Sequence, residues 1–561
     1  MPTLRHIRFA VSTSLLTLLF AFSSASYAQS KTDSITVKGR IKNLTIQLYR
    51  QSPNVTIARN NILQASREMA RPAPLQPDGS FQVTLPLVYP YEELYFNFGQ
   101  ISTAFLASAG TVEIAVDADS LFLSEAPFRF SGTNAQVNNQ LTRYKAFEFK
   151  NRPKIDNRQL SRRVAGRSAE DSRKILTNEF MTTYEKYRQT NEVLPLLDQY
   201  INSVIRYEVA AFLYDKALAE QDSRLETTVS VSSLRPADDR FLTVQRTTAM
   251  ERFAEYAGAR VPDLSLTSSG RSIPISTFAG LVDRYVTDLS ETERSRIREL
   301  KTAKTGQNRD ITMLQRIMQR NDEKLSKLLT YETTMAQYRK VVDSTGLEYM
   351  KAHFLAMNMA TIELKNQELL YQHIRPQVAD PYYRLSLEEL YRLEVKDSAT
   401  VREVAGKFTD RQLDEPVEVL SGVTLLRSSL YGKEFIQQLQ KQAQGRLIYV
   451  LAWSTDVEPS RQEVLASQAI QEQLSGRDIL FAYVCSNETS MNHWREWVAK
   501  NKPKGLHVYV DQDQLLNLMG TLRSESIPAA GLLGRDGKII KRDAPLPSRP
   551  DEVLKLIREK I

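Results

Sequence analysis

Cysteine is almost absent from this sequence, because Cys485 is the only one in 561 residues. A chain with one thiol cannot form an internal disulfide, so its stability must come from packing. It also cannot contain a Cys-x-x-Cys pair, which excludes both a zinc ribbon and a two-thiol redox centre. The five histidines show no His-x-x-x-His or His-Glu-x-x-His spacing. We therefore predict neither a metal site nor a cofactor.

The sequence also lacks a large excess of positive or negative charge. It has 74 Lys and Arg residues and 66 Asp and Glu residues, so its formal net charge is +8. The two signs are mixed along the middle of the chain, which is typical of solvated helix faces rather than of a nucleic-acid groove. We predict no nucleic-acid partner. Asp511 and Asp513 resemble the start of a calcium loop, but the glycine and the distal glutamate of such a loop are missing. We interpret them as residues that precede and cap a helix.

Long apolar runs are confined to the N-terminus, where Phe9–Phe22 follows two arginines. This run is shorter than the roughly 20 residues that a membrane-spanning helix needs, and Ala28 suits signal-peptide cleavage. We predict a signal peptide over residues 1–28 and an exported protein of the periplasm or cell envelope. Gln29 and Ser30 follow the predicted cleavage site, so lipid attachment at a cysteine there is excluded. No later segment is apolar enough to predict a transmembrane span.

Residues 29–133 have the pattern of β-strands. β-branched and aromatic residues alternate with polar ones, and turn signals such as PDGS (77–80) separate the runs. Residues 44–50, LTIQLYR, are among the runs that we interpret as strands. We predict a small antiparallel β-sandwich for this part of the chain.

Residues 134–424 change to a helical period, in which apolar side chains such as Leu176 and Phe180 recur every three or four positions. Ser386 and Glu389 have the spacing of a capping box, which predicts the start of a late helix. We find no repeat of fixed period, which disfavours a solenoid. This part of the chain is predicted to be a helical region whose faces pack on one another.

Residues 425–561 alternate strands and helices. A buried-type strand over 446–453 precedes a helix, a second strand that ends at Cys485, another helix and a third strand. A short helix, a hairpin with its turn at residues 536–537 and a terminal helix follow. This order predicts a parallel βαβ core with an antiparallel pair beside it. The whole chain is therefore expected to be a multidomain protein of α and β structure, with a C-terminal α/β fold.

The segment VLAWSTDVEPSRQE (450–463) allows a family to be named. It resembles the periplasmic thioredoxin-like thiol-disulfide oxidoreductases of the TlpA and ResA type, in which a strand runs into a pattern like Trp-Ala-x-Trp-Cys-x-Pro-Cys. Trp453 matches the first tryptophan and Pro459 the proline between the cysteines. Val457 and Ser460 stand where the two cysteines belong.

The segment ESIPAAGLLGRDGKII (525–540) matches the other half of such a site, and the resemblance places Ile527 and Pro528 at its cis-proline position. DAPLPS (543–548) is similar to the stretch that follows this hairpin in related Bacteroidetes proteins. The resemblance implies a thioredoxin-like fold over residues 425–561. More weakly, PDGSF, FLASAGTVEI and SGTNAQVNN resemble the β-sandwich that precedes such domains in the same bacteria.

The residues at the two cysteine positions cannot carry out the thiol-disulfide exchange of such enzymes. Disulfide exchange needs a thiolate near a helix N-terminus and a second thiol that resolves the mixed disulfide. Val457 cannot ionise, and Ser460 would need a histidine base, although the nearest in sequence, His493, lies on another predicted helix. Asp456 and Glu458 are interpreted as solvated carboxylates beside the start of the helix.

The first hypothesis is therefore a redox-inactive, non-catalytic protein whose retained groove binds an extended polypeptide or a cell-envelope protein. The groove is predicted to comprise Trp453, Asp456, Glu458, Pro459, Ile527 and Pro528. One alternative is a one-thiol oxidoreductase that uses Cys485, although a packed strand residue is the simpler interpretation of this thiol. Another is a glycan-binding envelope protein, which would need exposed aromatic residues in the N-terminal part; the candidates are Tyr89, Tyr91, Tyr95 and Phe96.

Overall fold

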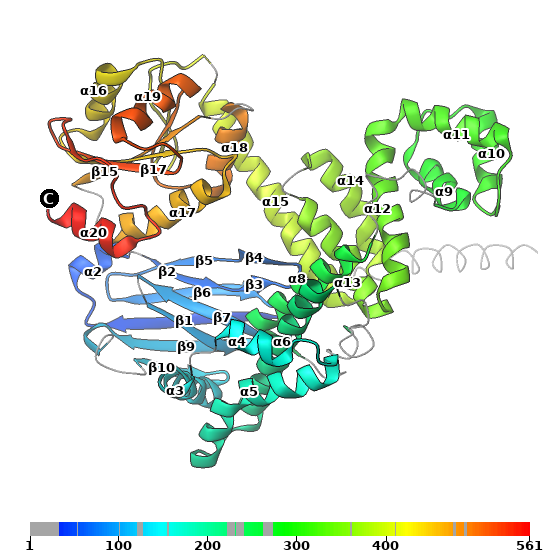
Figure 1. Ribbon diagram of the computed structural model, residues 1–561, viewed down its shortest axis with the longest axis horizontal. Coiled ribbons are helices and arrows are strands. Elements are labelled where there is room, and N and C mark those ends of the chain that lie inside the picture. The colour runs from blue at the N-terminus through cyan, green and yellow to red at the C-terminus, as the bar shows by residue number, and fades with distance from the viewer. Residues whose placement is uncertain are drawn as a thin grey trace, which may run out of the picture.

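The computed structural model describes residues 33–560, apart from 53, 100, 121–126, 154–155, 222–230, 232–239, 262–272, 360–361, 410, 475–477 and 487–490. The predicted signal peptide over residues 1–28 lies outside the described residues. The chain combines helices with several sheets (Figure 1). Within the described residues, none of the helices combines the length and the hydropathy that a membrane span requires.

Two sheets make up most of the N-terminal part. The first has the order β10-β9-β1-β6 and the second the order β11-β7-β2-β5, with β8 beside β7. The strands of the first sheet are β1 (Ser34–Lys42), β6 (Ser80–Pro86), β9 (Gly110–Asp117) and β10 (Phe128–Gly132). Those of the second are β2 (Asn54–Ala58), β5 (Arg71–Pro74), β7 (Tyr91–Phe98), β8 (Ile101–Ala107) and β11 (Phe241–Leu242). A short pair, β3 (Asn60–Asn61) and β4 (Gln64–Glu68), stands apart.

The two sheets share one hydrophobic core. Alternate side chains of β1, such as Val37, are buried in it together with Ile57 of β2 and Phe96 of β7. The pairing is not purely antiparallel, because β1 runs parallel to β9 and β11 runs parallel to β7. The prediction of an antiparallel arrangement is wrong at these two pairs.

Residues 44–50 do not form the predicted strand. They include the start of α2 (Ile46–Gln51), a short helix whose N-cap Thr45 accepts a hydrogen bond on its Oγ1 from the backbone N of Leu48 at 3.1 Å. Capping by Thr45 therefore outweighs the β-branched composition of this segment.

The middle of the chain is helical, and most of its buried side chains belong to one large core. Its helices are α3 (Ala135–Asn151), α4 (Asn157–Val164), α5 (Ala169–Thr190), α6 (Pro195–Glu220), α8 (Val244–Ala259), α9 (Ile275–Tyr285), α10 (Glu291–Leu300), α11 (Asn308–Arg320), α12 (Asp322–Val341), α13 (Ser344–Asn358), α14 (Leu364–Ile374) and α15 (Pro381–Lys407). The short strand β11 interrupts this helical order and joins the N-terminal sheet, next to Tyr91 and Glu92.

The predicted capping box at Ser386 and Glu389 is wrong. The helix α15 begins earlier, at Pro381, and its N-cap is Asp380, whose carboxylate accepts hydrogen bonds from the backbone N of Tyr382 at 2.8 Å. Ser386 is buried inside the helix, and Glu389 pairs with an arginine of the N-terminal part. The sequence spacing was that of a cap, but the tertiary contacts of both residues lie elsewhere.

The C-terminal part is built on a seven-stranded sheet with the order β12-β13-β16-β15-β14-β17-β18. Its strands are β12 (Val417–Leu420), β13 (Val423–Arg427), β14 (Leu447–Trp453), β15 (Ile479–Cys485), β16 (Gly505–Tyr509), β17 (Ala529–Leu533) and β18 (Ile539–Lys541). Its helices are α16 (Gly432–Ala443), α17 (Glu458–Gln473), α18 (Met491–Asn501), α19 (Gln512–Leu522) and α20 (Pro550–Arg558). The predicted boundary at residue 425 falls inside β13, so the sheet begins before it.

Helices cover both faces of this sheet (Figure 1). Tyr449, Leu451 and Trp453 of β14 point to the core that includes side chains of α17 and α20, whereas Ile448 and Val450 point to the core that includes side chains of α16 and α19. The strand is therefore apolar at every position, as the buried-type run over 446–453 predicts.

Candidate functional site

The ends of neighbouring strands bring the predicted loop residues to one edge of the C-terminal sheet. Trp453, the last residue of β14, stands opposite Cys485 of β15, which in turn stands opposite Tyr509 of β16. On the other side, Ala452 pairs with Ala529 of the antiparallel β17, so Pro528 lies just beyond the last pair. The carboxyl edge of a parallel sheet is where α/β folds usually bind ligands. We take this edge as the candidate functional site.

The loop after β14 is held by hydrogen bonds and one ion pair. The backbone N of Asp456 donates to Oγ of Ser454 at 3.1 Å, and Val457 is the N-cap of α17. The guanidinium of Arg461 donates to the carbonyl of Thr455 and forms an ion pair with Glu458. These contacts hold the turn and the first turn of the helix at the edge of the sheet.

The two positions that match cysteines differ in exposure. Val457 is half-buried at the start of α17, where an attacking thiol would meet a substrate. Ser460 is 0% exposed, and in the described part of the chain its Oγ has no hydrogen-bond partner. A histidine base is therefore not in contact with this hydroxyl, and the Ser460 position has the character of a packed site.

Cys485 is 0% exposed and packs in the core below the edge. Burial raises the pKa of its thiol far above its ordinary value, and the nearby negative charge of Asp456 adds to this shift. The thiolate is the reactive form of cysteine, so this environment keeps the thiol protonated and unreactive at neutral pH. The structure favours the interpretation of Cys485 as a packed strand residue.

Trp453 does not line a groove, contrary to the prediction. Its side chain is fully buried, and its ring packs against that of Trp497 with 4.8 Å between ring centroids. The reason is the alternation of β14, which directs Trp453 into the same core as Tyr449.

The other predicted groove residues remain accessible. Asp456, Glu458 and Pro459 are exposed, while Ile527 and Pro528 are half-buried. The resemblance implied a cis bond before this proline, and the Ile527–Pro528 bond is cis. The accessible part of the edge therefore consists of the loop after β14 and the loop before β17.

Sequence reasoning did not single out Tyr509 or Arg461, although both belong to this edge. Tyr509 is half-buried at the end of β16, directly beside Cys485 in the sheet. Its place as the last residue of the third predicted strand could have identified it, because parallel strands end at the same edge. The hydrogen bond from Arg461 to the carbonyl of Thr455 could not have been predicted from a sequence pattern.

The aromatic residues proposed for glycan binding do not form an exposed row. Tyr89 and Phe96 are buried, and the ring of Tyr89 stacks on that of Tyr382 at 4.5 Å. Tyr91 packs against Phe241. The requirement of the glycan hypothesis is therefore not met, because Tyr89 packs on the helical region, Tyr91 on β11, and Phe96 in the core of the N-terminal sheets.

The acidic residues after β16 have a structural role. Asp511 is the N-cap of α19 and forms a capping box with Gln514, so the prediction that it caps a helix is confirmed. Across the described residues, no group of three His, Cys, Asp or Glu side chains is placed to hold a metal ion.

Comparison with known proteins finds matches among solved structures, whereas no protein-family model and no curated protein matches this chain. A candidate thiol-disulfide oxidoreductase of Bacteroides vulgatus is 29% identical, over 21% of this chain and 77% of that chain, with a TM-score of 0.20. The thioredoxin domain of a thiol-disulfide oxidoreductase, also from Bacteroides vulgatus, is 14% identical, over 21% of this chain and 81% of that chain, with a TM-score of 0.19. A thioredoxin-like protein of Bacteroides caccae is 10% identical, over 53% of this chain and 97% of that chain, with a TM-score of 0.18.

Proposed function

We propose that the C-terminal sheet and its helices form a thioredoxin-like unit without redox chemistry, and that its accessible edge binds an extended polypeptide or a cell-envelope protein. The observation that carries this proposal is the absence of an accessible thiol at positions 457, 460 and 485. Val457 and Ser460 have no thiol, and Cys485 is buried with a raised pKa.

The missing chemistry follows from the requirements of thiol-disulfide exchange. An accessible thiolate must attack the substrate disulfide, and a second thiol must then release the product. The start of α17 would favour a thiolate at position 457, because the helix dipole places partial positive charge there. Valine at this position removes the nucleophile, and serine at position 460 removes the resolving group.

The binding role is supported by the parts of the edge that persist. Asp456 in the loop and Glu458 and Pro459 at the start of α17 are exposed, and Arg461 contacts this segment. The segment follows β14, whose residue Ala452 pairs with Ala529 at the start of β17. A rigid loop that costs little entropy to order is suited to recognition. Polypeptide binding needs such a surface but no thiol.

The proposal includes export of the protein. The basic and apolar leader over residues 1–28 has the features of a signal peptide. Purification of the protein from the cell envelope of its host, followed by mass spectrometry of its N-terminal peptide, tests this point. A mature chain that begins after Ala28 is expected, and retention of the leader in a cytoplasmic fraction would contradict export.

The experiment that tests the missing chemistry restores the two thiols. We would measure reduction of a disulfide-bonded model substrate by the wild-type chain, by Cys485→Ser, and by the double variant Val457→Cys/Ser460→Cys. The wild type and Cys485→Ser are expected to be silent. The double variant is expected to gain activity, because position 457 is half-buried at a helix start and position 460 lies one helical turn inside.

Two results would contradict the proposal in different ways. Activity of the wild type that disappears in Cys485→Ser would show a one-thiol oxidoreductase. A double variant that folds but stays silent would show that the edge does not have the geometry of a thioredoxin site. The single variants Val457→Cys and Ser460→Cys serve as matched controls, because neither contains a complete pair.

A further inference from the structure

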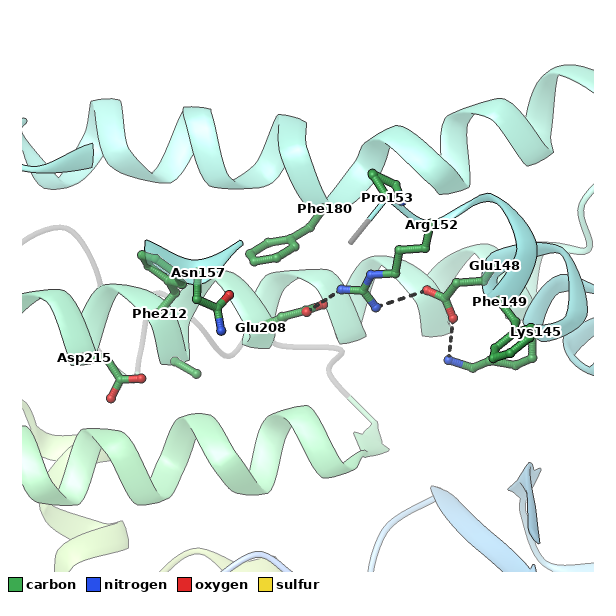
Figure 2. A pocket seen from close by; sticks show the side chains of 11 residues that line it. Lys145, Glu148, Phe149, Arg152, Pro153, Asn157, Phe180, Glu208, Phe212 and Asp215 are labelled. Carbon is green, nitrogen blue, oxygen red and sulfur yellow. Dashed lines mark hydrogen bonds and ion pairs between the residues drawn. The ribbon is translucent and has the colours of Figure 1, made fainter. Parts of the chain in front are cut away.

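A cleft is lined by residues of α3, α4, α5 and α6 (Figure 2). These helices lie on a part of the molecule remote from the C-terminal sheet (Figure 1). The volume of the cleft is about 670 Å³. This value is in the range of pockets that accept side chains or small ligands, which is roughly 300–1,000 Å³. The candidate site at the sheet edge shares none of its lining residues.

Three phenylalanines give the cleft an apolar lining. Phe149 comes from the end of α3, Phe180 from α5 and Phe212 from α6. Phe149 is 91% exposed, and the other two are partly buried. In Figure 2, Phe180 and Phe212 lie on one side of Arg152, and Phe149 lies on the other side, beside Lys145. Accessible aromatic side chains that line one cleft together with charged groups are a feature of interaction sites. Packing within the chain does not account for Phe149.

Both cations of the cleft lining are already paired with carboxylates of the lining. Arg152 lies between two carboxylates, with its guanidinium 2.6 Å from Glu208 and 3.4 Å from Glu148 (Figure 2). Lys145 is 3.0 Å from the other oxygen of Glu148. Among the described lining residues, three carboxylates, including that of Asp215, oppose two cations, so their net charge is negative.

The negative bias continues beyond the rim. Asp215 pairs with Arg252 of α8 at 3.2 Å, but Arg252 also pairs with Glu255 at 2.7 Å. Glu251 lies on the same helix, and its pKa is raised by burial and by the charge of Glu255. One cation thus faces three carboxylates at this end of the cleft.

We propose that this cleft binds a basic peptide segment, which inserts an aromatic or large aliphatic side chain beside Phe180 and Phe212, lays a second apolar side chain against Phe149, and places a Lys or Arg beside Glu208. The excess of carboxylates matches a cation and opposes an acidic partner. A bound cation also gains from the faces of the aromatic rings. Pockets usually bury 70–90% of a small ligand's surface, and a rim residue as exposed as Phe149 does not enclose one to that extent. A longer segment can cover it.

Fluorescence anisotropy of labelled peptides tests this proposal on the full chain. The probe is a twelve-residue amidated peptide in which Phe and Lys alternate with Ser, and its counterpart has Glu in place of Lys. We expect saturable binding of the Lys peptide, weakened by salt, and binding of the Glu peptide weaker by about tenfold or more.

Two variants locate the binding. Phe149→Ser and Glu208→Gln are each expected to weaken binding of the Lys peptide by about tenfold, since buried aromatic anchors and paired charges dominate such interfaces. The matched controls are Ile46→Ser, at an exposed apolar residue of α2, and Glu170→Gln, at an exposed carboxylate of α5. Both controls are expected to bind like the wild type.

The proposal is overturned if neither peptide saturates, if both bind equally, or if both cleft variants bind like the wild type. Because Phe149 makes little contact with the rest of the chain, its replacement should leave the unfolding temperature unchanged. This separates lost binding from lost folding. The disulfide-reduction activity of the double variant Val457→Cys/Ser460→Cys is measured at the other site, so failure of the peptide test leaves that result standing.

Discussion

Arg59 and Glu92 form a buried ion pair, in which Nε of the arginine lies 3.3 Å from Oε2 of the carboxylate. Glu92 also accepts hydrogen bonds from the backbone N of Val88 and Tyr89. On the other side, Arg59 pairs with Glu389 of α15, which joins the N-terminal sheets to the helical region. Because the side chains of Arg59 and Glu92 are both buried, removing either charge leaves the other one buried without its partner.

Replacement of Arg59 by Met should therefore destabilise the protein strongly. Burial raises the pKa of Glu92, and the charge of Arg59 opposes this shift. Without Arg59 the carboxylate is buried and unpaired, which costs about 3–5 kcal/mol. Urea unfolding followed by circular dichroism measures the loss. Arg40→Met removes an exposed pair with Asp78 and should change stability by less than about 1 kcal/mol; equal losses in the two variants would contradict the prediction.

Ser460→Ala should be neutral or stabilising by about 1 kcal/mol, because it removes a buried hydroxyl without a partner in the described residues. Ser467, about two helical turns further along α17 and also buried, is the matched control. Its Oγ contacts the hydroxyl of Tyr483 and donates to the carbonyl of Val464 at 2.6 Å, so Ser467→Ala should destabilise. Thermal unfolding of both variants tests the contrast, and a larger loss from Ser460→Ala would refute it.

Cys485 should react with a thiol reagent only when the chain unfolds. Its side chain is fully buried and its pKa is raised by burial, so the native protein at pH 8 should show almost no labelling by Ellman's reagent. In denaturant, one thiol per chain should react. Rapid labelling of the native protein would show an accessible thiolate and revive the one-thiol hypothesis.

Acid should destabilise the protein partly through His507. Burial lowers its pKa to about 4, while the unfolded chain titrates near the ordinary value of 6.5. Between these pH values the unfolded state binds the proton and the folded state does not, so stability is complete above pH 6.5 and falls as the pH drops towards 4. The full effect is about 3 kcal/mol. His353, whose pKa burial also lowers to about 4, acts in the same direction.

Melting temperatures measured from pH 7.5 to pH 4.5 check this prediction. His507→Phe keeps a ring that can pack on Tyr483, where the imidazole now stacks at 4.7 Å, and should melt with a shallower pH dependence than the wild type. Identical slopes for the wild type and His507→Phe would show that this histidine does not contribute.

Local signals in the sequence predicted the elements whose causes are local. The hairpin over residues 529–541, the cap at Asp511 and the buried strand over 446–453 depend on turn chemistry, capping and apolar runs. Elements that depend on distant partners were not predictable. The pairing of Phe241 with Tyr91 is an example, because it joins segments that are 150 residues apart in the sequence.

The candidate site was predicted in part for the same reason. The loop and the proline could be placed from a motif, but which way Trp453 points depends on the register of β14 against β15 and β17. Likewise, Ser386 and Glu389 have the spacing of a cap, and only the approach of Asn61 and Arg59 reveals their contacts. A sequence pattern therefore limits the local conformations of a residue, and tertiary contacts determine which of them it adopts.

The helix α15 contacts both the N-terminal part and the C-terminal part of the chain. It has 27 residues and is therefore about 40 Å long, at about 1.5 Å per residue. Its first half carries Glu389 to Arg59, its central residue Glu394 pairs with Lys500 at 3.0 Å, and Nζ of Lys407 at its end donates to the carbonyl of Val419 at 2.9 Å. A continuous helix bends only gently. The N-terminal sheets and the C-terminal sheet are therefore both attached to one continuous helix, through the ion pairs of Glu389 and Glu394.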